Sequence, residues 1–146
     1  MKTSQKGIDF IKSFETLQLK AYKAVPTELY FTVGYGHYGP DVGSSTVLTK
    51  AEADKLFEAD LSVYEMAVSR QTYDLTLRQS QFDALVSFTF NVGVHAFESS
   101  TLLKKIRAKA SEDEIRKEFA RWNKSGGKVL GGLTRRRQEE ADMYFS

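Results

Sequence analysis

A stripe of apolar residues opens the chain and predicts its first helix. Four apolar side chains recur at three-residue steps from Ile8 to Leu17, and the polar side chains fall away from the centre of the stripe. This spacing is typical of an amphipathic helix with one buried face, so we predict a helix over about residues 4–15. Glu15 is one of the polar residues and is expected near the C-terminal end of that helix.

The pattern then changes to short β-branched and aromatic runs. Between Leu19 and Thr46 these runs are interrupted every few positions by Gly or Pro. Apolar runs bounded by Gly and Pro are typical of short strands joined by tight turns. The sequence therefore predicts a small antiparallel sheet lobe over about residues 15–48.

The rest of the chain returns to helical spacing. Three predicted helix starts carry a capping box, in which a Ser or Thr and a Glu or Gln three residues later bond each other's backbone amides. The first start predicts a long connecting helix over 49–70, and the second predicts a helix that is apolar on nearly all sides and therefore buried. The three boxes are Thr49 with Glu52, Thr76 with Gln79, and Ser111 with Glu114. Shorter helices are expected near 101–108, 111–122 and 134–144, with a glycine-rich loop over 125–132.

Together these patterns predict an α+β fold with two lobes in a single domain. We expect the sheet lobe, the connecting helix and a larger helical lobe over 71–146, with the first helix packing on the helical lobe. A chain of 146 residues with 41% hydrophobic residues is long enough to bury a substantial core.

Composition narrows the classes of function. The formal net charge of +2 is too small to indicate a nucleic-acid partner, although it suits a polyanionic polymer such as a cell wall. No window approaches the roughly 20 apolar residues of a membrane span, so we expect no stable membrane association. The first residues, from Met1 to Lys6, do not lead into the apolar core of a signal peptide. The absence of cysteine excludes disulfides and thiol chemistry.

Two features resemble functional motifs, but the surrounding sequence argues against both. The run GYGHYG at 34–39 has the spacing of a dinucleotide-binding fingerprint, but that fingerprint needs a helix to begin at its third glycine, and Pro40 opposes one. The two histidines, His37 and His95, stand far apart without neighbouring ligands. We therefore predict neither a nucleotide cofactor nor a metal site.

Three other features have a plain structural interpretation. The basic run Arg135–Arg137 lies on a predicted terminal helix, where such runs usually form a solvated face. Trp122 shares a helical stripe with apolar residues and is expected to anchor the core. His95 follows a glycine turn and is expected to be a surface or loop residue.

The segments on either side of Glu15 and along the helical part form a recognisable set. They run in order along nearly the whole chain: FETLQLKAY at 14–22, YFTVGYGH at 30–37, QFDALVSF at 81–88, FNVG at 90–93, STLL at 100–103, RWNK at 121–124, and GL at 132–133 followed by RRR at 135–137. In this order the chain resembles the phage-type lysozymes, the muramidases that serve as endolysins.

The resemblance implies the two-lobe lysozyme fold and hydrolysis of the β-1,4 bond between N-acetylmuramic acid and N-acetylglucosamine in bacterial peptidoglycan. It implies no cofactor. The family's general acid is the Glu at the end of the first helix, which is Glu15 here, and an inverting mechanism is the family expectation. The role is chemically sensible, because the leaving oxygen of a glycosidic bond needs a proton.

The chain departs from the family pattern at the second carboxylate. An Asp is expected at the position that Ala24 occupies, and the segment from there to Thr32 is two residues longer than the pattern. Three hypotheses remain open. Glu28 could replace the missing carboxylate; Thr32 could hold the attacking water alone; or the site could be largely disabled, naturally or by a change at this position.

The family pattern also suggests contacts with the glycan. Our candidates follow the catalytic motif or lie in the helical part: His37, Tyr38, Phe90, Asn91, Ser100 and Asn123. For Phe90 a place in the core is at least as good an interpretation. We expect a monomeric endolysin that stays in the host cytoplasm until a holin-like partner opens the membrane. The rival hypothesis, motivated by Ala24, is a peptidoglycan-binding module without turnover.

Overall fold

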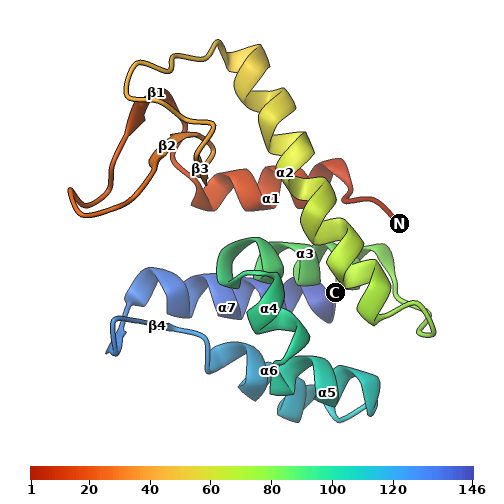
Figure 1. Ribbon diagram of the computed structural model, residues 1–146. Coiled ribbons are helices and arrows are strands. Elements are labelled where there is room, and N and C mark those ends of the chain that lie inside the picture. Colours follow the sequence, from red (N-terminus) through yellow and green to blue (C-terminus); the bar gives the residue numbers. More distant parts are fainter. The chain divides into compact units, whose positions relative to one another are not determined.

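Seven helices and five short strands make up the computed structural model, which describes all residues from 1 to 146 (Figure 1). The chain divides into two compact units, one made of Asp9–Val63 and the other of Met1–Ile8 with Tyr64–Ser146. The helices are α1 (Gln5–Phe14), α2 (Lys50–Gln71), α3 (Gln79–Val92), α4 (Val94–Glu98), α5 (Thr101–Arg107), α6 (Glu112–Ala120) and α7 (Gly131–Tyr144). The strands are β1 (Gln18–Tyr22), β2 (Phe31–Gly34), β3 (His37–Gly39), β4 (Lys124–Ser125) and β5 (Lys128–Val129).

The first unit contains the predicted small antiparallel sheet. Its strands lie in the order β1-β2-β3, so β2 is central. In the β2–β3 pair Thr32 lies opposite Tyr38 and Val33 lies opposite His37. The tight turn between these strands places Gly36 at φ +82°, a left-handed conformation that glycine adopts at little cost. The GYGHYG run therefore forms a hairpin and not the start of a helix.

Helices α1 and α2 supply the core of the same unit. The ring of Tyr35 lies 5.4 Å from that of Phe57 on α2, and the ammonium of Lys12 on α1 lies 4.7 Å from the Tyr35 ring centre. The Nζ of Lys12 also lies 3.0 Å from Asp54. Lys12 thus joins α1 to α2 through its charge and to the β2–β3 turn through an aromatic ring.

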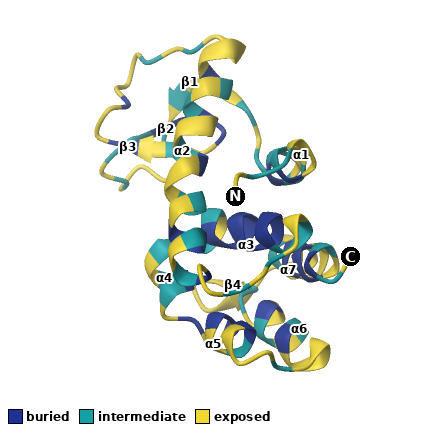
Figure 2. Cartoon of the chain, turned by 90° about the vertical axis from the view of Figure 1, so that its right-hand side faces the viewer, coloured by how far each residue is buried: buried dark blue, intermediate teal, exposed yellow.

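The second unit is built around α3. All residues of α3 from Phe82 to Thr89 are buried, which confirms the prediction of a buried helix and appears as dark blue in Figure 2. The ring of Phe88 meets those of Phe119 and Trp122 edge to face, at 5.8 and 5.5 Å. Trp122 is therefore part of the apolar packing, as expected.

The first residues of the chain are fixed to this unit by two carboxylates. The backbone amide of Ser4 donates to Asp83 on α3 at 3.0 Å, and that of Thr3 donates to Glu65 on α2 at 2.6 Å. A Cβ added at Gly7 would lie 2.6 Å from Cγ of Asp83, so only glycine allows this approach.

Two of the three predicted capping boxes are confirmed and one is wrong. Thr49 and Ser111 each exchange hydrogen bonds with the residue three positions later. The predicted box at Thr76 does not begin α3. The helix starts at Gln79, and the amide of Arg78 donates to the side chain of Gln81 at 2.8 Å. The glutamine that caps the helix is therefore Gln81, two residues after the predicted Gln79.

The last third of the chain differs from the prediction in three places. The short helix α4 was not predicted, although His95 on it is exposed, as expected for a surface residue. The expected loop over 125–132 contains the β4–β5 hairpin, whose turn places Gly126 and Gly127 at φ +57° and +80°. Helix α7 also begins at Gly131, three residues before the expected start. No helix of the chain is long and apolar enough to cross a membrane.

Candidate functional site

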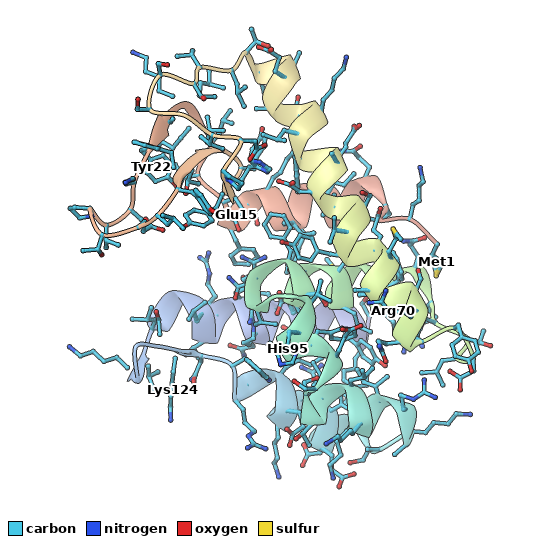
Figure 3. The ribbon with its side chains drawn as sticks, viewed as in Figure 1. Met1, Glu15, Tyr22, Arg70, His95 and Lys124 are labelled. Atoms are coloured by element: carbon cyan, nitrogen blue, oxygen red, sulfur yellow. The ribbon has the colours of Figure 1, made fainter.

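Glu15 follows directly after the last residue of α1 and is half-buried (Figure 3). Its backbone amide donates to Lys12 at 3.1 Å, which closes the final turn of the helix. Its carboxylate lies beside the β2–β3 turn, because a Cβ added at Gly36 would be 3.5 Å from Oε2 of Glu15. The end of α1 and a side-chain-free turn together place this carboxylate.

Thr32 lies in the middle of the sheet on β2 and is only 8% exposed. It pairs with Tyr38 on one side and with Tyr22 on the other. The Thr32 hydroxyl makes no hydrogen bond to another group of the chain. The strand therefore positions this hydroxyl, which can still bind a water or a substrate atom.

The segment between β1 and β2 contains Ala24 and Glu28, and Ala24 is exposed. The carboxylate of Glu28 accepts a hydrogen bond from the amide of Val25 at 3.0 Å, and the amide of Glu28 donates to the carbonyl of Val25 at 3.1 Å. The Glu28 side chain therefore closes its own turn. This contact gives no support to Glu28 as the substitute carboxylate.

His37 is held from both sides of its ring. Nδ1 lies 2.8 Å from Asp60 on α2, and Nε2 lies 2.8 Å from Asp41 in the loop after β3. Partial burial lowers the pKa of His37, but the hydrogen bonds and negative charges of Asp60 and Asp41 outweigh it and raise the pKa above 6.5. The ring of His37 thus ties the hairpin to two other segments of its unit.

Tyr38 is the most open of the candidates in the sheet. It is 45% exposed, its hydroxyl accepts from the amide of Tyr30 at 3.2 Å, and the two rings meet edge to face at 5.5 Å. A partly exposed ring held in this way could stack against a sugar face.

Phe90 and Asn91 occupy the last turn of α3 in the helical unit. Phe90 is partly exposed and meets the ring of Tyr64 edge to face at 5.2 Å. Asn91 is exposed, and its Oδ1 accepts from Nη2 of Arg137 on α7 at 2.8 Å. Each of these side chains is therefore partly accessible to solvent, while a neighbouring side chain of the same unit holds it in place.

Ser100 and Asn123 have local structural partners. The Ser100 hydroxyl caps α5 by accepting from the amide of Leu103 at 3.0 Å, and it donates to the carbonyl of Phe97 at 2.7 Å. Ser100 is only 4% exposed, so this arrangement supports a capping role and not a glycan contact. Asn123 is partly exposed and donates to Thr134 at 3.2 Å.

The prediction of a solvated arginine face on the last helix is wrong for two of its three residues. Arg135 is exposed, but Arg136 and Arg137 are buried together with Glu140. Arg136 lies 3.3 Å and Arg137 2.7 Å from the Glu140 carboxylate, which also accepts from Ser87 at 2.6 Å. Burial raises the pKa of Glu140 and lowers that of Arg137, because each ion has lost its water.

The predicted site residues fall into two groups. Glu15, Thr32, Glu28, His37 and Tyr38 belong to the unit Asp9–Val63; Phe90, Asn91, Ser100 and Asn123 belong to the other. The sequence interpretation missed Gly36 beside Glu15, both partners of His37, and the role of Glu140. The spacing of Arg136 and Glu140, four residues apart on a helix, was an available signal for the last of these. No group of three His, Asp or Glu side chains is placed to hold a metal ion.

Comparison with known proteins assigns the chain to a family. The family described as phage lysozyme matches residues 12–140. The endolysin of Bacillus phage B103 is 49% identical over the whole of this chain, which covers 55% of that protein. The chain belongs to the phage lysozyme family.

Solved structures agree with this assignment. The muramidase domain of SpmX from Asticaccaulis excentricus is 34% identical and superposes with a TM-score of 0.88, with 99% of this chain and 98% of that one covered. An endolysin from Escherichia coli O157:H7 phage FAHEc1 is also 34% identical and superposes with a TM-score of 0.87, with 100% of this chain and 94% of that one covered. The predicted lysozyme-like α+β fold class is thereby confirmed. The chain spans only about half the length of the Bacillus phage relatives that it matches.

Proposed function

We propose that this chain is the catalytic part of an endolysin that hydrolyses the β-1,4 bond between N-acetylmuramic acid and N-acetylglucosamine, with Glu15 as the general acid. The observation that carries the proposal is the Glu15 carboxylate, half-buried at the end of α1 and beside the bare backbone of Gly36. Family membership and the muramidase and endolysin names of its relatives support the choice of substrate.

In this reaction Glu15 gives its proton to the glycosidic oxygen as the bond from that oxygen to the anomeric carbon breaks. A water then adds to the anomeric carbon from the opposite face and releases a proton to the solvent, which gives inversion, and Glu15 takes up a proton from the solvent before the next turnover. The turn at Gly36 places no side chain against the Glu15 carboxylate, because a Cβ at residue 36 would lie 3.5 Å from its Oε2.

Thr32 is our choice for the group that holds the attacking water. Thr32 is buried on the central strand, and its hydroxyl has no hydrogen-bond partner in the chain. Glu28 is the weaker choice because its carboxylate already accepts from Val25. A site with one carboxylate would lack a second negative charge opposite the developing positive charge on the sugar, so we expect a modest rate.

Loss of turbidity of a purified cell-wall suspension tests the proposal. Glu15→Gln keeps the shape of the side chain and removes the proton donor, and we expect a loss of about 100-fold or more. Full clearance by this variant would contradict the assignment of Glu15. Glu28→Gln should have little effect, and Thr32→Ala should lower the rate strongly; the reverse result would move the water-holding role to Glu28.

Ala24 is the basis of the second candidate function, a peptidoglycan-binding module without turnover. The position is exposed and carries no polar group that could act on a substrate. Sedimentation with cell walls, measured beside the turbidity assay, separates the two: binding without release of soluble glycan supports the module. Ala24→Asp should increase the rate if the chain is an enzyme, and no increase would mean that the longer loop places residue 24 elsewhere.

The biological setting is part of the same proposal. We infer a monomer that reaches the wall of the host bacterium from the cytoplasm after a holin-like partner opens the membrane. The endolysin names of its phage relatives support this setting. Lysis of cells expressing the chain with and without a membrane-permeabilising protein tests it, and equal lysis in both would contradict it.

A further inference from the structure

Asn91 is unusual among the exposed polar residues because a buried cation fixes it. Its Oδ1 accepts from Nη2 of Arg137 at 2.8 Å, across the contact between α3 and α7. Arg137 is completely buried, whereas Asn91 is exposed. One end of the Asn91 amide therefore faces the interior and the other end faces outward.

The chemistry of arginine decides which end is which. A guanidinium has only donors, so the atom of Asn91 that contacts it must be the carbonyl oxygen. The NH₂ group of Asn91 is left at the exposed end, and it makes no hydrogen bond within the chain. The exposed end of the Asn91 side chain thus offers N–H donors, while its acceptor oxygen faces Arg137.

Arg137 itself has almost no freedom to move. Its Nε lies 2.7 Å from Oε1 of Glu140, and its guanidinium lies 5.2 Å from the centre of the Phe88 ring. Its Nη1 has no hydrogen-bond acceptor, so Asn91 is one of few partners that this buried cation has. Rotating the Asn91 amide would bring its donors against the cation, which is unfavourable, so the orientation is held before any ligand binds.

We propose that Arg137 is a positioning residue that makes Asn91 a fixed hydrogen-bond donor for an amide carbonyl of the glycan substrate. This inference rests on the proposed function, because it deepens the recognition of the same substrate. Peptidoglycan offers that chemistry in two places, the N-acetyl groups of the sugars and the peptide bonds of the stem peptides.

The decisive variant is Asn91→Asp. A carboxylate keeps an acceptor for Arg137 but turns the outward group from a donor into an acceptor, so the fold is retained and the contact with a carbonyl is lost. We expect a melting temperature that is not lowered, because the new carboxylate pairs with Arg137, and a dissociation constant raised by about fivefold or more, the effect of one lost hydrogen bond with added repulsion. Gln138→Glu on the exposed surface of α7 makes the same change of charge and should leave the dissociation constant unchanged.

Binding is measured by calorimetry in the Glu15→Gln background, so that no bond is cut during the titration. The probes are a tetrasaccharide of alternating N-acetylglucosamine and N-acetylmuramic acid, and the same tetrasaccharide with stem peptides. If Asn91→Asp weakens binding of both probes, the carbonyl belongs to the N-acetyl group. If it weakens binding of the peptide-bearing probe alone, the carbonyl belongs to the stem peptide. Equal affinities of the Asn91→Asp variant and its parent for both probes would overturn the inference.

A second variant tests the positioning role of Arg137. Arg137→Lys should leave the Asn91 side chain less fixed, which three-bond couplings report as averaging between rotamers, and should weaken binding by a few-fold. A single rotamer in this variant with unchanged binding would contradict the role. If the parent binds neither probe, the proposed function fails; if it binds both and Asn91→Asp binds equally well, only this inference fails.

Discussion

Oε2 of Glu15 stands 3.5 Å from the place that a Cβ on Gly36 would occupy. Any side chain at residue 36 would therefore touch the carboxylate that we assign as the acid. The turn needs glycine for its backbone as well, since φ is +82°. The same residue thus serves the fold and the site, and the two effects can be separated.

Gly36→Ala should lower both stability and activity. The left-handed backbone costs about 1–2 kcal/mol for a residue with a Cβ, and the new methyl would occupy space beside Oε2 of Glu15. Gly127→Ala is a matched control, because Gly127 has φ +80° and no neighbour within 4 Å. We expect the two variants to lose similar amounts of unfolding free energy in chemical denaturation. Only Gly36→Ala should also clear cell walls more slowly. Equal rates would mean that the space beside Glu15 is not used.

The pairing of His37 with Asp60 and Asp41 should make stability depend on pH. The pKa of His37 is raised in the folded chain, so the folded state holds the proton more tightly than the unfolded state. The stabilisation is complete below about pH 6.5, the unfolded value, and is lost as the pH rises through the higher folded value. We expect the difference in melting temperature between the parent and His37→Gln to shrink from pH 5.5 to pH 9. A constant difference would mean that the charge of His37 contributes nothing.

The two carboxylates that pair with His37 should contribute unequally to the pH dependence of stability. Asp60 has a 25% exposed side chain, whereas that of Asp41 is 64% exposed and its pairing is weakened by water. Asp60→Asn should therefore remove more of the pH dependence than Asp41→Asn in the same melting series. The opposite order would make the loop after β3, and not α2, the main support of His37.

The end of α5 carries a lysine where glycine is favoured. Lys109 has φ +54°, and its amide donates to Ile106 while that of Ala110 donates to Lys105, the pattern of a Schellman motif. Lys109→Gly should stabilise the fold by about 1 kcal/mol because the left-handed strain disappears. The same change at Lys104, inside α5 and exposed, should destabilise by about 1 kcal/mol. Two urea titrations giving shifts of the same sign would contradict this.

Glu140 should be the most sensitive charge in the helical unit. Glu140→Gln removes the buried carboxylate that lies 3.3 Å from Arg136 and 2.7 Å from Arg137, which we expect to cost about 3–5 kcal/mol. The neighbouring Glu139→Gln is the control, because Glu139 has a half-exposed side chain 3.5 Å from exposed Arg135. That change should shift the free energy of unfolding by less than about 1 kcal/mol. A small loss for Glu140→Gln in guanidinium titration would mean that water reaches the pair.

Local sequence determined the elements whose causes lie within a few residues. The caps at Thr49 and Ser111, the turn-rich strands and the apolar run of α3 depend on spacing alone, and each appears in the structure. Several motifs in register determined the family and pointed to Glu15, because a lone glutamate at the end of a helix carries no specific signal. The cap at Thr76 failed because Gln81 offered Arg78 an equally local bond.

Tertiary structure decided the features whose partners are distant in the chain. Arg136 and Arg137 are buried because Ser87 and Asn91, more than forty residues earlier, and Glu140 on their own helix compensate their charge. The clamp on His37 depends on Asp60 from another element, and the bare turn beside Glu15 depends on how the β2–β3 hairpin meets the end of α1. Periodicity reports which face of an element is apolar. It does not report which charge faces which, and that depends on packing between segments far apart in the sequence.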